Sequence, residues 1–355
     1  PDPDRFHLPV VAKMVKAMLA GTFSTFGFDD SKSHSVVTTN LRDAGYVFGA
    51  SAVAVLWDYM SLPQVERSET ELATFKRGLK SMNAWYGSRH VTKLILTDLP
   101  ESAARASYKT SGWTCFEREV ANLISPPWCM LTLARGSSAY KKLFKKEHSY
   151  EEFDYIEISY DAFLAGARSG PMTVEKFDAL LDTLTFTNGA DKTVVRPKYH
   201  ECFSTLVEGA TELSLRGYNL ENEAMEKALQ VLLTHCRHVE KLDLAGNSMK
   251  PRLEPFVQGV APWASSLKTL DLSNTRVLGD VQLFGQLVHL QRLCLRLTRV
   301  TGNVGGLAPL LNLQKLDLSY TQVTVDVGGF APLLNLQTLN LTWCSKVTGD
   351  VGGLA

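Results

Sequence analysis

The sequence lacks an excess of charge of either sign and lacks long apolar runs. Its 37 Lys and Arg residues balance 37 Asp and Glu residues, so there is no electrostatic reason to expect nucleic acid or an anionic membrane as a partner. The longest apolar run, over residues 49–57, is too short to span a bilayer. No signal-peptide pattern opens the chain. We therefore expect neither nucleic acid nor membrane as a partner.

Cysteine is also scarce. The six cysteines are scattered, with no C-x-x-C pair and no histidine at ligand spacing. This pattern argues against a zinc site or a disulfide framework, and it favours free thiols in a reducing compartment. We therefore predict no bound metal, no cofactor and a cytoplasmic location.

The last third of the chain contains a repeated phrase. The segments 267–272, 290–295, 313–318 and 336–341 share the pattern L-x-x-L-x-L, and each follows the last at a step of 23 residues. Longer copies precede them, at residues 239–244 and, more weakly, 210–215. This period and pattern resemble the leucine-rich repeat, in which the leucines point inward from short strands and the strands stack into a parallel sheet on the concave side. The resemblance implies six copies over residues 210–355, the last one incomplete.

The ninth position of each copy usually carries an asparagine that bonds the backbone of the following turn. Asn247 fills it once, Thr275, Thr298 and Thr321 fill it in three copies, and Cys344 fills it in the last. A hydroxyl can serve the same backbone, and a buried cysteine acts as a small apolar residue. We therefore expect a structural role for Cys344 rather than a redox one.

The outer half of the 23-residue copies is rich in glycine and proline, which excludes a long helix and predicts turns and short 3₁₀ segments. On the opposite, concave side, charged residues stand beside aromatic ones, as a protein-binding face requires. The candidate partner-binding residues are Asp243, Asp271, Arg292, Lys315, Asp317, Tyr320, Asn340 and Trp343. The alternative is that these side chains are only the polar face of a sheet.

The first part of the chain alternates apolar strand patterns with amphipathic helix patterns. This alternation predicts an α/β domain with a parallel sheet. The expected elements are a helix at 8–19, a loop at 22–40, strands at 46–57, 91–96 and 154–160, and helices at 68–86 and 117–124. A helix beginning near Thr173 and a turn at 186–191 are expected to lead into the repeats.

Two short blocks of this domain resemble the Toll/interleukin-1 receptor (TIR) family. Ser111, Trp113 and Glu117 match its Ser-x-Trp-x-x-x-Glu signature, and residues 57–64 resemble a block found in TIR-like domains of unicellular eukaryotes. The resemblance covers residues 8–125 and implies a TIR- or flavodoxin-like fold. In catalytic relatives the glutamate supports cleavage of NAD, since a carboxylate stabilises an oxocarbenium-like centre.

Under that resemblance Glu117 is the candidate catalytic carboxylate. Asp58, which follows the strand expected at 46–57, would lie at the same sheet edge. The alternative is that Trp113 and Phe116 pack the helix onto the sheet and that Glu117 is a solvated carboxylate in its first turn.

We predict three regions: a TIR-like α/β domain at 1–165, a helical linker or solenoid cap at 166–209, and the repeats at 210–355. Because the chain starts at Pro1 and stops within a repeat, we expect a fragment of a longer protein. The predicted function is protein interaction or sensing through the repeats, joined to a signalling module. The alternatives are an NAD hydrolase, with NAD as substrate, and a structural scaffold.

Overall fold

The chain folds into two compact units in the computed structural model. The first comprises Pro1–Ala121, Pro127–Ala167 and Ala179–Arg196, and the second comprises Asn122–Pro126, Arg168–Asp178 and Pro197–Ala355. The structure describes residues 8–19, 23–26, 68–88, 91–98, 110–125, 130–132, 156–159, 170–186, 189–216, 222–247, 250, 252–344 and 346–349.

The first part of the chain contains helices and parallel strand pairs. Its elements are α1 (Leu8–Leu19), β1 (Phe23–Phe26), α4 (Glu69–Tyr86), β2 (Lys93–Ile95), α5 (Gly112–Ile124), β3 (Met130–Thr132) and β4 (Ile156–Ser159). β1 pairs with β4 and β2 pairs with β3, both in parallel, as the α/β prediction requires. The predicted loop at 22–40 is wrong at β1, because pairing with β4 overrides its polar composition. The strand expected at 46–57 lies outside the described residues.

Helix α4 begins with a capping box formed by Ser68 and Glu71. The Ser68 backbone N–H donates to Glu71 Oε2 at 2.8 Å, and the Glu71 N–H donates to Ser68 Oγ at 3.3 Å. This exchange satisfies two backbone donors that the first turn of a helix leaves free. Leu72, the first residue of the apolar row expected on this helix, is 40% exposed, so that row is not buried at its start.

Helix α5 starts at Gly112, five residues before the predicted start at Glu117. The extra turn is fixed from outside the helix, since the Gly112 N–H donates to the Thr185 carbonyl oxygen at 2.9 Å. A side chain at Gly112 would collide with the Phe186 ring, whose Cζ lies 2.0 Å from the Cβ position. A pattern read along the helix alone cannot detect this long-range contact, so the sequence predicted the start too late.

Two helices, α8 (Val174–Asp182) and α9 (Asp191–Phe203), and one π-helical turn, Ser204–Glu208, precede the repeats. The Lys176 N–H donates to Thr173 Oγ1 at 3.4 Å, which confirms the predicted cap. Phe177 stacks on Tyr199 with ring centroids 3.7 Å apart, and the Tyr199 hydroxyl donates to the Met172 carbonyl oxygen at 2.8 Å.

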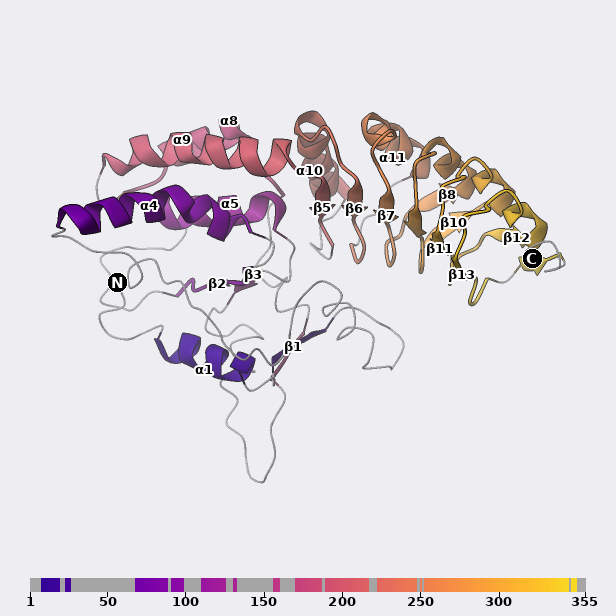
Figure 1. Cartoon of the computed structure of the whole chain (residues 1–355), viewed down its shortest axis with the longest axis horizontal. Coiled ribbons are helices and arrows are strands. Elements are labelled where there is room, and N and C mark those ends of the chain that lie inside the picture. The colour runs from indigo at the N-terminus through magenta and orange to yellow at the C-terminus, as the bar shows by residue number, and fades with distance from the viewer. Residues whose placement is uncertain are drawn as a thin grey trace, which may run out of the picture. The chain divides into compact units, whose positions relative to one another are not determined.

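The repeats form one parallel sheet of six strands. Figure 1 shows these strands side by side, with helices on the other face of the array. The strands are β5 (Glu212–Ser214), β6 (Lys241–Asp243), β7 (Thr269–Asp271), β9 (Arg292–Cys294), β11 (Lys315–Asp317) and β13 (Thr338–Asn340). Their central leucines align in register: Leu213, Leu242, Leu270, Leu293, Leu316 and Leu339.

The core of the array is a column of inward-facing leucines. From Leu213 through Leu318, the second and third leucines of the first five copies are at most 3% exposed. Each buried leucine contributes about 1.5–3 kcal/mol relative to an exposed one. Trp263 is fully buried among them, and its indole Nε1–H donates to the Cys236 carbonyl oxygen at 2.7 Å.

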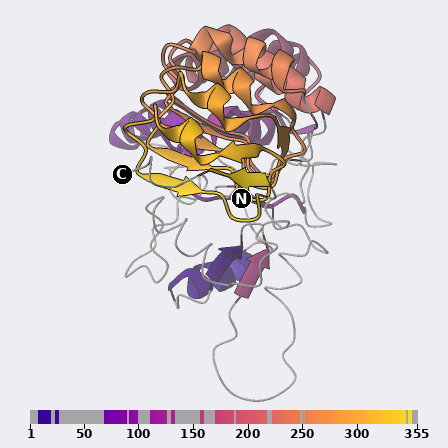
Figure 2. The ribbon, with the colours of Figure 1, turned by 90° about the vertical axis from the view of Figure 1, so that its right-hand side faces the viewer.

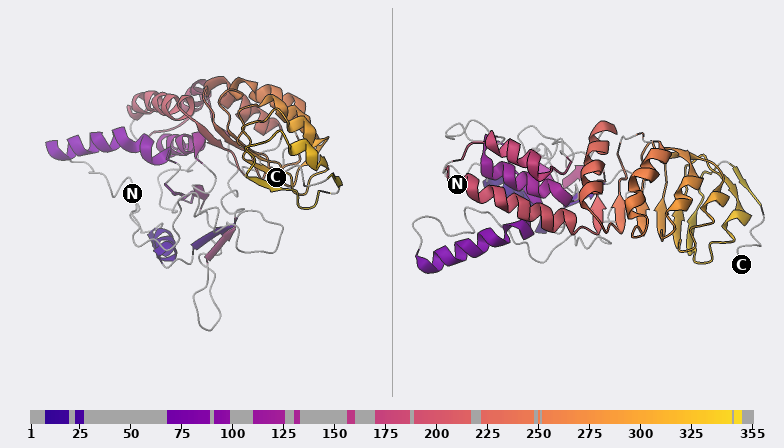
Figure 3. Two further views of the ribbon diagram at one scale, coloured as in Figure 1. Left: turned by 45° about the vertical axis from the view of Figure 1, so that its right-hand side comes forward. Right: turned by 90° about the horizontal axis from the view of Figure 1, so that it is seen from above.

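The outer face changes along the array, as Figures 2 and 3 show. The long copies carry α10 (Asn222–His235) and α11 (Leu253–Val260), with a 3₁₀ turn at Ala261–Trp263. The 23-residue copies carry the 3₁₀ segments Val281–Gln286, Val304–Leu307 and Val327–Phe330 instead, as predicted. The sequence analysis missed four short outer strands in two parallel pairs: β8 (Leu278–Asp280) with β10 (Arg299–Thr301), and β12 (Thr324–Asp326) with β14 (Lys346–Thr348).

The ninth position of the copies has the predicted structural role. Asn247 Nδ2 donates to the carbonyl oxygens of Leu215, in the preceding copy, and Leu244, both at 2.8 Å. Each threonine at this position donates to a carbonyl oxygen of its own copy at 2.6 Å. Cys344 Sγ reaches the preceding copy, where it donates to the Leu318 carbonyl oxygen at 3.1 Å. Asparagine and cysteine therefore bond to a carbonyl group of the neighbouring copy, whereas each threonine donates to a carbonyl group of its own copy.

This difference predicts unequal losses of stability. We expect Asn247→Ala to lower the free energy of unfolding by about 2–4 kcal/mol, because two buried carbonyl groups lose their donor. Thr298→Ala removes one such bond and should cost about 1 kcal/mol. Urea denaturation of both variants checks this, and equal losses would contradict the bridging role of Asn247.

Candidate functional site

The exposed face of the six-stranded sheet carries the candidate binding residues. Because side chains alternate across a strand, the residues on either side of each inward leucine point to this face. We call it the sheet face. One column of it is Glu212, Lys241, Thr269, Arg292, Lys315 and Thr338, and the next is Ser214, Asp243, Asp271, Cys294, Asp317 and Asn340.

Four of the predicted partner-binding residues close the turn after their own strand. One carboxylate oxygen of Asp243, Asp271 and Asp317 accepts the backbone N–H two residues further on, at 3.1, 2.9 and 2.9 Å. The Asn340 side-chain oxygen does the same for Thr342 at 3.1 Å. This local bond explains the recurrence of Asp and Asn at the position without any partner. The second carboxylate oxygen of each aspartate remains for other contacts.

Arg216 joins two of these aspartates across neighbouring copies, and the sequence analysis missed it. Its Nε donates to Asp243 Oδ2 at 2.7 Å, and its Nη2 contacts Asp271 Oδ2. Burial raises the pKa of Asp243 from 3.8 to about 6; the Asp271 carboxylate raises it too, and Arg216 opposes both. Arg216 follows the weakest copy of the repeat phrase, and only the stacking of the copies brings it beside Asp271.

Two lysines of the first three copies are also paired with glutamates. Lys241 contacts Glu212 across adjacent strands, and Lys268 Nζ lies 2.8 Å from Glu240 Oε1. Lys241 and Lys268 are both about half exposed, with side-chain exposures of 54% and 44%. Exposed pairs of this kind add little stability. These ion pairs nevertheless neutralise most of the charge on this part of the sheet face.

The fourth and fifth copies differ in two cations of the sheet face, Arg292 and Lys315. Arg292 and Lys315 are register partners on adjacent strands, and both are exposed. Neither forms an ion pair with any residue that the structure describes. Like charges opposite each other on neighbouring strands destabilise a sheet by about 0.2–1 kcal/mol. Cys294 lies two residues after Arg292 on the same strand, in the next column. Burial raises the pKa of its thiol to about 12, so the group is neutral at physiological pH.

A row of residues with left-handed backbone lies at the edge of the sheet face. The same position of successive copies is Gly246, Asn274, Leu297, Tyr320 and Trp343, with φ angles of 68, 52, 55, 57 and 60°. Glycine and asparagine adopt this conformation readily. For other residues it costs about 1–2 kcal/mol. The last three copies therefore place large apolar residues where the backbone disfavours them.

Tyr320 and Trp343 form an exposed aromatic pair at this edge. Their rings stack with centroids 6.0 Å apart and planes 25° apart. Tyr320 is 39% exposed and Trp343 is 73% exposed. The Arg296 guanidinium carbon lies 5.5 Å from the centre of the Tyr320 ring, within range of a cation–π interaction. The predicted residues Arg292, Lys315, Tyr320 and Trp343 thus share one region with Arg296, which was not predicted.

Of the two candidate catalytic residues in the first part of the chain, the described residues include Glu117. Glu117 is half-buried on α5, and Asp58 lies outside the described residues. Trp113 donates from its indole Nε1 to Asp191 Oδ2 at 2.9 Å and meets the buried Phe116 ring edge to face. Trp113 therefore has a packing role. This agrees with the alternative interpretation of the motif, in which Trp113 and Phe116 pack the helix.

The described ranges show neither a cluster of metal-ligating side chains nor a membrane-spanning helix. They contain no group of three or more His, Cys, Asp and Glu side chains placed to hold a metal ion. Over the same residues, no helix combines the length and apolar character needed to cross a membrane.

Comparison with known proteins supports the repeat assignment. A family profile described as Leucine Rich repeat matches residues 235–251, which include the second strand of the sheet. No curated protein matches the sequence. With the six in-register strands and the 23-residue period, this match supports the assignment of leucine-rich repeats to the last third of the chain.

Several solved structures share a similarity with part of the chain. Internalin C2 from Listeria monocytogenes is 24% identical, with a TM-score of 0.32, over 42% of this chain and 59% of that one. The ectodomain of the Arabidopsis thaliana receptor kinase SOBIR1 is 20% identical, with a TM-score of 0.29, over 33% and 64%. The Arabidopsis HAESA ectodomain, solved with a peptide hormone, is 18% identical, with a TM-score of 0.34, over 40% and 27%. Each alignment spans less than two thirds of the other protein.

The raised pKa of Asp243 predicts a pH dependence. An aspartate whose pKa rises on folding stabilises the fold below about pH 4, and this contribution is lost as the pH rises through about 6. The stability of the wild type relative to Asp243→Asn should therefore fall by about 2 kcal/mol between about pH 4 and pH 7. Denaturation of both proteins across this range checks it. A difference that does not change with pH would show that Asp243 keeps its ordinary pKa.

Proposed function

We propose that this leucine-rich repeat protein binds another polypeptide on its sheet face, at the end formed by the fourth to sixth copies. The observation that carries the proposal is the exposed aromatic pair, Tyr320 and Trp343, held in a backbone conformation that disfavours both residues. Aromatic residues and arginine are the side chains that most often dominate binding energy in protein interfaces. The protein thus acts as an interaction or sensing protein.

A purely structural array does not account for these residues. The turn-closing bonds explain the aspartates, and the ninth-position bonds explain the threonines. Neither explains Tyr320 or Trp343, because Gly246 and Asn274 occupy the same position with less strain. Strained positions persist where function selects them. We therefore favour a binding surface over a scaffold.

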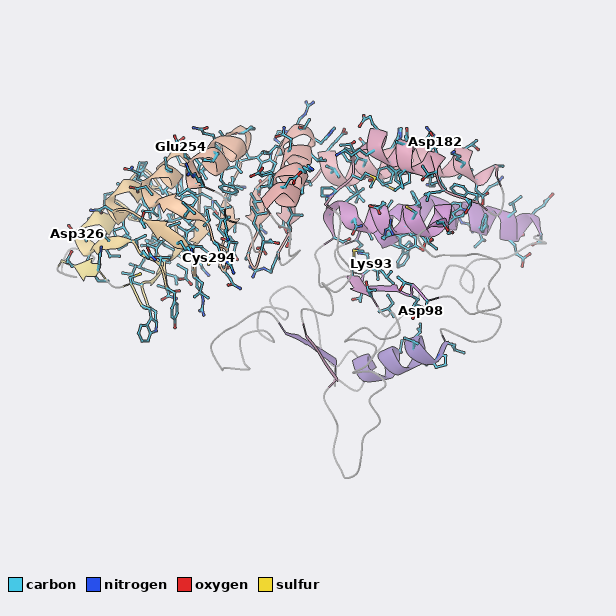
Figure 4. All side chains as sticks on the ribbon, turned by 180° about the vertical axis from the view of Figure 1, so that it is seen from behind. Lys93, Asp98, Asp182, Glu254, Cys294 and Asp326 are labelled. Carbon is cyan, nitrogen blue, oxygen red and sulfur yellow. The ribbon has the colours of Figure 1, made fainter. Side chains whose placement is uncertain are left out.

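Photo-crosslinking tests where partners bind. p-Benzoylphenylalanine is placed at Thr338, an exposed position of the sheet face, and in a matched protein at Glu254, exposed on α11. Figure 4 shows that Glu254 and Cys294, a residue of the sheet face, lie on opposite sides of the array. We expect irradiation of cells to give discrete adducts from position 338 and none from 254. Equal adducts from both positions, or none from either, would refute binding on the sheet face.

We further propose that the first part of the chain is a TIR-like signalling module to which the repeats supply the sensor. Support comes from the order α4, β2, α5, β3 with β2 and β3 parallel, and from the Ser111, Trp113 and Glu117 motif at the start of α5. Its catalytic form would be an NAD hydrolase that uses Glu117. The packing role of Trp113 offers this activity no support, so interaction is the preferred function.

Nicotinamide release tests the catalytic form. If Glu117 supports cleavage of NAD, Glu117→Ala should lower nicotinamide release by about 100-fold or more relative to the wild type. Glu119→Gln would disturb the core, since Glu119 is buried. Glu69→Ala, at an exposed position of α4, is therefore the control. Equal release from the wild type and Glu117→Ala would remove the catalytic role.

A further inference from the structure

We infer that Arg292, Arg296, Lys315, Tyr320 and Trp343 form one subsite for an acidic segment of an extended polypeptide. We call it the cation–aromatic cluster. Carboxylates of the partner would lie against the cations, and an aromatic or proline side chain would lie on the exposed Trp343 ring. This inference rests on the proposed function, because it names the chemistry of the partner that the sheet face binds.

The first support is the uneven pairing of charge along the sheet face. In the first three copies every lysine and arginine of this face contacts a carboxylate of the chain: Arg216, Lys241 and Lys268. In the fourth and fifth copies, Arg292 and Lys315 face each other across adjacent strands without such a partner among the described residues. A carboxylate from outside would relieve this repulsion, and arginine can hold it with two hydrogen bonds.

The second support is the backbone at the aromatic positions. Tyr320 and Trp343 have positive φ angles that the equivalent Gly246 and Asn274 tolerate better. The backbone conformation therefore disfavours aromatic residues at these positions. The Arg296 guanidinium contacts the Tyr320 ring, whereas most of the Trp343 side chain is exposed. An exposed indole stacked on Tyr320, whose other neighbour is the Arg296 guanidinium, suits an apolar ring flanked by acidic groups.

The sign of the charge favours a polypeptide over a nucleic acid. Asp243 and Asp271 share a single cation, Arg216, so the first copies leave an excess of negative charge on the sheet face. A polyanion that lies along the whole face would meet this repulsion. A polypeptide can carry acidic residues only where it contacts the cation–aromatic cluster. Its charge can therefore complement both the negative and the positive part of the sheet face.

The test starts from a random peptide library selected on the full chain. We expect the enriched peptides to combine Asp or Glu with Phe, Tyr, Trp or Pro. The leading peptide should bind Arg292→Ser/Lys315→Ser at least about tenfold more weakly than the wild type. Lys241→Ser is the matched control, since Lys241 occupies the same strand position as Lys315 but is paired with Glu212. Its affinity should stay within about twofold of the wild type.

A second variant separates binding from folding. Trp343→Asn places at this position the residue that Asn274 already provides in an equivalent turn. We expect it to bind the leading peptide at least about tenfold more weakly while its melting temperature is no lower than that of the wild type. A purely structural role for Trp343 predicts the reverse, a lower melting temperature with unchanged affinity.

The outcomes distinguish this inference from the proposed function. Enriched peptides that are not acidic would refute the cation–aromatic cluster as a subsite for an acidic segment. Peptides that bind the Arg292→Ser/Lys315→Ser variant as well as the wild type would refute it too. If adducts at position 338 persist in that case, binding on the sheet face still stands. An oligothymidylate that binds with the same dependence on Arg292 and Lys315 would assign the cluster to nucleic acid instead. If no peptide is enriched and no adduct forms, both proposals fail.

Discussion

The structure of the repeats depends on the burial of each copy's leucines against those of the next copy. A single copy offers one short strand and a few apolar side chains, which cannot form a core alone. In-register pairing aligns Leu242, Leu270, Leu293 and Leu316 in one fully covered column. Because the leucines must all point inward, the residues between them must all point to the sheet face. The constraint that stabilises the array therefore also creates its surface.

The chain then closes its turns with local polar bonds. Asn247 and Cys344 reach a carbonyl group of the preceding copy, and the turn aspartates each accept a backbone N–H two residues on. These bonds occupy the groups that a short repeat would otherwise leave unsatisfied in its interior. Residues that take no part in closure are free to vary between copies. Arg292, Lys315 and Trp343 are among these variable residues. They differ from the residues at the equivalent positions of other copies, and these differences support the proposed binding site.

Charge and backbone strain together divide the sheet face into two parts. The first copies pair their cations internally, through Arg216 and the lysines beside it. The later copies leave cations exposed and carry aromatic residues where glycine or asparagine would fit more easily. Neither property alone would single out a site, since exposed charges are common and isolated apolar residues on a surface are normal. Their coincidence over neighbouring copies is what points to a partner.

The sequence by itself determined the repeat period, the six strands, the inward leucines and the ninth-position residues, because each depends on a local pattern that recurs at fixed spacing. It also identified the exposed residues, since alternation along a strand assigns each side chain to a face. Only the tertiary structure decided which charges meet, such as Arg216 with Asp271, and where α5 begins, against Thr185. It alone placed Tyr320 and Trp343 in left-handed backbone. These features depend on contacts between residues far apart in the chain and on dihedral angles, which the residue types Arg, Tyr and Trp do not reveal by themselves.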